Sequence, residues 1–87
     1  MGTKSNPGNF DCYASAEPDE PMFILLARDP SAYILVHEWA DRREWAIDRG
    51  EKPEEDRAMV SEARECAIAM EKFFEERRAR KLRESME

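Results

Sequence analysis

The sequence predicts a mainly α-helical fold, in which two helices form an antiparallel hairpin and one short apolar segment packs across it. Residues 30–49 and 53–83 both carry apolar side chains at intervals of three and four, the spacing of one buried helix face. The connection between them is short, so the two helices should be antiparallel neighbours. At 87 residues, the chain is long enough for one small domain with a modest core.

The first helix is expected to span Pro30–Arg49. Asp29 is a favourable N-cap, Pro30 fits the first helical position, and Gly50 is a common residue just after a helix. The apolar stripe of this helix consists of Ala32, Leu35, Val36, Trp39, Ala40, Arg43 and Ala46.

The second helix is expected to span Pro53–Arg83. Three acidic residues follow Pro53, and they suit the positive end of the helix dipole. The apolar stripe consists of Met59, Ala63, Cys66, Ala67, Met70, Phe73 and Phe74. We expect Leu35, Val36 and Trp39 of the first helix to face Met59, Ala63, Cys66, Met70 and Phe73, which makes Trp39 a core residue.

The longest apolar run of the sequence, Met22–Ala27, lies between Pro21 and Pro30. Its length fits either a buried strand or a short helix that begins at Pro21. The β propensities of Phe23 and Ile24 and the abrupt end of the run favour a strand.

Such a strand would be apolar on both faces, and the chain offers no clear second strand to pair with it. We therefore expect a homo-oligomer, most simply a twofold dimer, in which this segment pairs with a second copy. Ile34 and Trp45 fall on the outer side of the first helix, where they are either scattered surface residues or a further contact. The predicted interface residues are Ile24, Ile34 and Trp45.

Residues 1–19 are rich in turn formers, and we expect them to form a flexible N-terminal arm on a single helical domain, residues 20–87. No segment approaches the roughly 20 apolar residues that span a bilayer, and no signal peptide is visible. These features predict a cytoplasmic protein without a membrane partner. The two cysteines, Cys12 and Cys66, are expected to be reduced thiols.

The charge is unevenly distributed along the chain. Residues 1–56 carry 13 acidic and 6 basic side chains, a net charge of −7, whereas residues 57–87 carry 7 acidic and 8 basic ones, a net charge of +1. Binding to duplex nucleic acid requires a basic surface, so we do not expect it here. The sequence has no catalytic motif or metal-ligand cluster, and His37 stands alone, so we expect neither an enzyme nor a cofactor.

Arg28 and Asp29 form the predicted ligand site, because they mark the junction between the apolar run and a helix N-terminus. A guanidinium and free helical amides suit a small anion, and Phe23 or Tyr13 could cover a base. Alternatively, Arg28 pairs with Glu20 or Asp19 while Asp29 only caps the helix. If an anion binds, Glu20 would orient Arg28.

Two further places could hold an anion. Arg43 lies within an apolar stripe, so it needs an exit at the edge of the helix, a carboxylate such as Asp29 or Glu20, or a ligand. The second place is the basic cluster of Arg77, Arg78, Arg80, Lys81 and Arg83. Cations also complement a helix C-terminus, and nearby glutamates could neutralise them, so this cluster has a purely structural explanation.

The segment Asp-Glu-Pro-x-Phe-x-Leu-x-Ala-x-Asp is followed by Trp39-Ala40 and a final helix rich in Glu, Ala and Arg. This pattern resembles small proteins of tailed bacteriophages and prophages over residues 10–75. The matching positions are Asp19, Glu20, Pro21, Phe23, Leu25, Ala27 and Asp29. Residues 77–87 extend beyond the pattern.

The resemblance implies a non-enzymatic accessory protein that acts on host machinery. One possible role is to sequester a small anionic nucleotide signal of host defence between subunits. An alternative is an acidic inhibitor that covers a basic surface of a host nuclease or another defence protein, as anti-CRISPR proteins do. A third is a structural or regulatory phage protein that makes only protein contacts.

Overall fold

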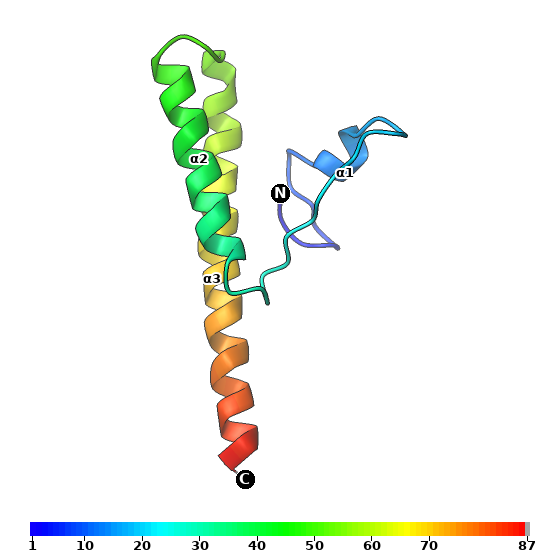
Figure 1. Ribbon diagram of the computed structural model, residues 1–87, viewed down its shortest axis with the longest axis vertical. Helices are drawn as coiled ribbons and strands as arrows, with labels where there is room; N and C mark the ends of the chain where they lie inside the picture. The colour runs from blue at the N-terminus through cyan, green and yellow to red at the C-terminus, as the bar shows by residue number, and fades with distance from the viewer. Residues whose placement is uncertain (87) are drawn as a thin grey trace.

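The computed structural model describes residues 1–86, in which two long helices pack side by side in opposite directions (Figure 1). They are α2 (Ala32–Asp48) and α3 (Arg57–Met86). A single-turn helix, α1 (Cys12–Ser15), lies in the N-terminal arm, and a 3-10 turn, η1 (Glu54–Asp56), precedes α3. The expected mainly α-helical hairpin is confirmed, although both helices begin a few residues later than expected.

The two ends of α2 follow the chemistry of their residues. Asp29 lies two residues before the assigned N-cap, Ser31, and its carboxylate accepts a hydrogen bond of 2.8 Å from the Ser31 amide. At the other end, Gly50 has a φ of +78°, and its amide donates to the carbonyl of Ile47 at 3.0 Å. The Glu51 amide donates to the carbonyl of Ala46, which completes a Schellman motif.

The seam between α2 and α3 consists of small side chains. Within residues 1–86 the buried hydrophobic residues are Ala32, Ala40, Ile47, Val60, Ala63 and Ala67. Trp39, expected in the core, is 38% exposed, and Leu35 and Phe73 are 44% and 49% exposed. The prediction that these large side chains form the core is therefore wrong. The helices pack through their buried alanines instead, and this contact leaves the larger side chains at the edge of the interface between α2 and α3.

Met22–Ala27 does not form the predicted strand. Residues 22–26 have no regular secondary structure, Ala27 begins a turn, and no strand occurs within residues 1–86. A strand needs a neighbour that accepts and donates backbone hydrogen bonds, and residues 1–86 of a single copy provide none. Phe23 and Ile24 are consequently 85% and 61% exposed.

The N-terminal arm lies to the side of the hairpin and contacts α3 at Glu62 (Figure 1). The Glu62 carboxylate accepts hydrogen bonds from the amides of Asn9, at 2.7 Å, and Phe10, at 2.9 Å. The amino group of Met1 lies 3.4 Å from the same carboxylate. The flexibility expected of this arm stays a prediction.

Ion pairs connect the helices toward their loop end. Arg64 on α3 bridges Asp41 at 2.8 Å and Glu44 at 3.2 Å on α2. Arg57, at the start of α3, pairs with Asp48 at 2.7 Å. No helix within residues 1–86 combines the length and the apolar character needed to cross a bilayer.

Candidate anion-binding site

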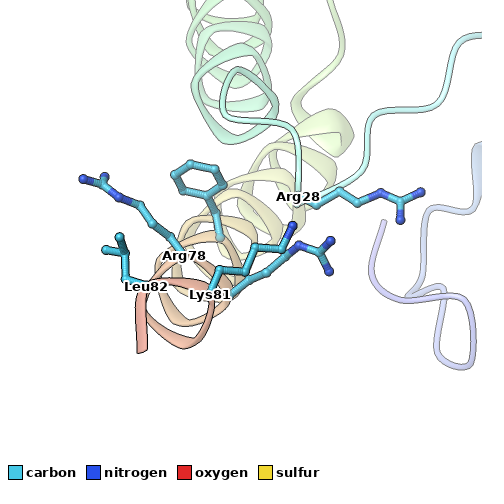
Figure 2. Close-up of a pocket in the computed structure, with 6 residues that line it drawn as sticks. Arg28, Arg78, Lys81 and Leu82 are labelled. Carbon is cyan, nitrogen blue, oxygen red and sulfur yellow. The ribbon is translucent and has the colours of Figure 1, made fainter. Parts of the chain in front are cut away.

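A basic pocket of about 340 Å³ lies at the open end of the hairpin, where α3 continues past the first residues of α2 (Figures 1 and 2). Its lining residues are Arg28, Phe74, Arg77, Arg78, Lys81 and Leu82. The pocket thus combines four cationic side chains with one aromatic ring. We use the name basic pocket for these six residues.

Turns before α2 place Arg28 at this pocket. The Asp29 amide donates to the carbonyl of Leu26 at 2.9 Å, and the Ala32 amide donates to the carbonyl of Asp29 at 3.1 Å. These bonds turn the chain into α2 and leave Arg28 at the corner beside α3. Asp29 therefore helps to position Arg28 by fixing the helix entry.

The other lining residues come from one face of α3. Phe74, Arg77, Arg78, Lys81 and Leu82 recur at intervals of three and four, so they share a surface of the helix. The half-buried ring of Phe74 lies against Tyr33 of α2, with 6.3 Å between the ring centroids. This contact fixes the aromatic side of the pocket where α2 begins.

The cations of the basic pocket lack carboxylate partners in the described structure. The ion pairs found within residues 1–86 involve no residue after Arg64. The predicted pairing of Arg28 with Glu20 or Asp19 does not occur there either. Glu20 instead accepts a hydrogen bond of 3.0 Å from the Glu17 amide. Within residues 1–86, these four cations are therefore free to pair with an anionic ligand.

Figure 2 shows that the basic side chains spread outward from the pocket. Arg28 and Arg78 extend in opposite directions, and Lys81 lies between them. Because each is a long side chain at the surface, several rotamers are accessible, and ordering them costs conformational entropy. An anion with several charged oxygens would recover this cost better than a single carboxylate, because it could engage more than one cation.

The structure does not bring the other predicted site residues to this pocket. Tyr13 and Phe23 line a separate apolar groove, described below, and they are 72% and 85% exposed. Arg43 pairs with Asp56 at 2.9 Å, rather than with Asp29 or Glu20.

The guanidinium of Arg43 also lies 5.1 Å from the ring of Trp39. Its half-buried position therefore has a structural explanation.

The sequence alone presents the Arg28 junction and the basic cluster as separate candidates, and it predicts Phe74 in the core. The three- and four-residue spacing of Phe74, Arg77, Arg78 and Lys81 is visible in the sequence and could have joined the ring to the cations. Their proximity to Arg28 depends on how α2 packs against α3, and no sequence signal provides it.

A larger apolar groove of about 710 Å³ separates the N-terminal arm from the hairpin. Phe23, Ile24 and Leu25 line it on one side, and Val36, Met70 and Phe73 line it on the other. Arg28 and Arg77 line both this groove and the basic pocket, so the two are adjacent. We use the name apolar groove for this region.

The described residues show no arrangement for metal chemistry. Among residues 1–86, no three His, Cys, Asp or Glu side chains gather closely enough to hold a metal ion. Burial raises the pKa of the Cys66 thiol, which makes it a weaker nucleophile at neutral pH.

Comparison of the chain with family profiles, with curated proteins and with solved structures gave no match.

Proposed function

We propose that this protein acts by binding rather than by catalysis, and that its ligand is a small phosphate-bearing anion of the nucleotide class. The observation that carries the proposal is the basic pocket, which places Arg28, Arg77, Arg78 and Lys81 around Phe74 without a carboxylate partner in residues 1–86. Guanidinium groups match the geometry of phosphate oxygens, and an aromatic ring offers a surface for a base.

The size of the pocket supports a ligand larger than inorganic phosphate. Its volume of about 340 Å³ falls within the range of small-molecule sites. A nucleotide would place its phosphates among the arginines and its base near the ring of Phe74. Together with the resemblance to small phage proteins, this chemistry supports sequestration of a nucleotide signal of host defence in the cytoplasm.

The alternative, an acidic inhibitor of a host defence protein, has less support. Several carboxylates toward the loop end already pair with arginines of the same chain, among them Asp41, Asp48 and Asp56. Binding a basic partner through these carboxylates would require breaking those pairs. A structural or regulatory role with only protein contacts remains compatible with the exposed apolar surface.

Calorimetry with ATP, a cyclic dinucleotide and inorganic phosphate tests the proposal. We expect Arg28→Ala and Arg78→Ala to weaken binding of at least one nucleotide by about 1.5–3 kcal/mol each, the scale of a hydrogen bond to a charged group. Arg80→Ala is the matched control, because Arg80 is an exposed cation of the same helix that does not line the pocket. It should change binding by less than about 1 kcal/mol.

Phe74→Leu separates recognition of a base from recognition of phosphate. It should weaken nucleotide binding while leaving the response to inorganic phosphate unchanged, because stacking requires the ring and phosphate contacts do not. Circular dichroism would verify that this variant keeps its helices. The basic pocket would be excluded as the site if Arg80→Ala and Arg28→Ala lost equal amounts of binding free energy, or if none of the three probes bound.

A further inference from the structure

The described residues leave an unusually large surface exposed for a protein of this size. The accessible surface is 7084 Å², whereas a folded monomer of 10.2 kDa exposes about 5,300 Å². The radius of gyration is 15.4 Å, against about 12 Å for a compact chain of this length. Part of this difference reflects the long α3, and part reflects apolar side chains that nothing covers.

Several of the uncovered apolar side chains line the apolar groove. Phe23 is 85% exposed, Ile24 61% and Phe73 49%. Leu35 and Trp39, 44% and 38% exposed, share a flank of α2 but do not line the groove. Scattered single apolar residues are normal at a surface, but a contiguous group beside a groove marks an interaction site.

We infer that a second copy of this chain covers the apolar groove in a twofold dimer. Phe23, Ile24, Leu25 and Leu26 form one wall of the groove, and the side chains of Phe23 and Ile24 remain 85% and 61% exposed. In a twofold contact, the exposed Phe23 and Ile24 of each copy can pack into the groove of the other, so one symmetric interface covers both grooves.

The exposed area is sufficient for such an interface. A standard protein interface buries about 800 Å² on each partner, whereas the surface of this chain exceeds that of a compact monomer by about 1,800 Å², a difference that also includes the projecting end of α3. The core points to the same conclusion, because within residues 1–86 no large side chain is fully buried. Two hairpins that share apolar surface would form a four-helix arrangement with a core that one hairpin lacks.

The dimer interface would border the basic pocket, because Arg28 and Arg77 line both regions. The inference does not depend on an anion ligand, since it rests on apolar surface alone. If a ligand binds, the second copy would form one wall of its site.

Sedimentation equilibrium of the full chain tests this inference. We expect a mass of twice 10.2 kDa for the natural sequence and a single-copy mass for Ile24→Asp. Ile68→Asp is the matched control, because Ile68 is 62% exposed, like Ile24 at 61%, but lies on α3 outside the groove. It should remain a dimer.

Hydrogen exchange gives an independent measurement at the proposed interface. The amides of residues 22–26 donate no hydrogen bond to any other described residue of the same chain. We therefore expect their exchange to slow as the protein concentration rises, and to stay fast in Ile24→Asp. A single-copy mass for the natural sequence would overturn the inference. A dimer that survives Ile24→Asp, or that Ile68→Asp dissociates, would overturn it as well.

Discussion

Glu62 is the residue at which two distant parts of the chain meet. Its carboxylate accepts hydrogen bonds from the amides of Asn9 and Phe10 and lies near the amino group of Met1. The bond from the Asn9 amide is the largest cause that holds the pKa of Glu62 below its ordinary value of 4.5. Protonation of this one group should therefore weaken the attachment of the N-terminal arm.

Acidification is expected to release the arm from α3. Because the folded-state pKa of Glu62 is depressed, its stabilising contribution is fully present above about pH 4.5 and is lost as the pH falls through the lower folded-state value. The amide resonances of Asn9 and Phe10 should shift together in an NMR titration across that range. In Glu62→Gln, these two resonances should already have at neutral pH the positions that the natural sequence reaches only in acid.

Glu65→Gln is the control for this titration, because Glu65 is exposed on the same helix and accepts no bond from the arm in the described structure. Its spectrum for the arm should match that of the natural sequence. If the amide resonances of Asn9 and Phe10 shift neither on acidification nor in Glu62→Gln, the contact between the arm and Glu62 does not hold the arm in solution.

At the scale of the helices, small residues decide how α2 and α3 pack. Ala40 and Ala63 are fully buried at the seam, together with Ile47 and Val60. Small side chains permit close approach of the two backbones, so the larger residues of the apolar stripes move to the edges of the hairpin. Trp39 occupies such an edge, under the guanidinium of Arg43.

This packing predicts that Ile47 matters more for stability than Trp39 does in a single copy of the chain. Ile47 is 4% exposed, so Ile47→Ala should cost about 2–5 kcal/mol of unfolding free energy through lost burial and a cavity. Trp39→Ala should cost less, because the ring is 38% exposed. Urea unfolding measures both.

The comparison is best made in the Ile24→Asp background, where the proposed dimer cannot add to the effect of Trp39. A larger loss for Trp39→Ala than for Ile47→Ala in that background would contradict the observed seam.

The ion pairs and the basic pocket lie in different parts of the molecule. Ion pairs cluster toward the loop end, up to Arg64, whereas the cations of the basic pocket lie at the open end. The principal extents of 54 × 30 × 20 Å describe an elongated particle with a small core. A molecule with so little buried apolar volume should gain much of its stability from association.

Thermal unfolding should therefore depend on protein concentration. If a second copy binds the folded chain, mass action raises the unfolding midpoint by several degrees over a roughly hundredfold range of concentration. Circular dichroism measures this midpoint. The Ile24→Asp variant should unfold at one temperature across the range, and Ile68→Asp should behave like the natural sequence. If the thermal unfolding midpoint of the natural sequence does not change with protein concentration, the result contradicts association.

Much of this architecture follows from local signals in the sequence. The apolar periodicity of residues 30–49 and 53–83, the short connection and Gly50 determine two antiparallel helices. Gly50 ends α2 because its positive φ is accessible to glycine at little cost, and this preference acts within a single turn of chain. Such signals need no information about distant residues.

Tertiary structure decided which members of each stripe form the core and which cations share a pocket. Trp39 and Ala40 both belong to the apolar stripe of α2, so either residue could face α3. The packing of the alanines buries Ala40 and leaves Trp39 at the edge. Likewise, the sequence predicts Phe74 and Lys81 on one helix face, but Arg28 lines the same pocket only because α2 begins beside Phe74. Met22–Ala27 lacks the predicted strand because β pairing needs a neighbouring backbone, which propensity within the segment cannot supply.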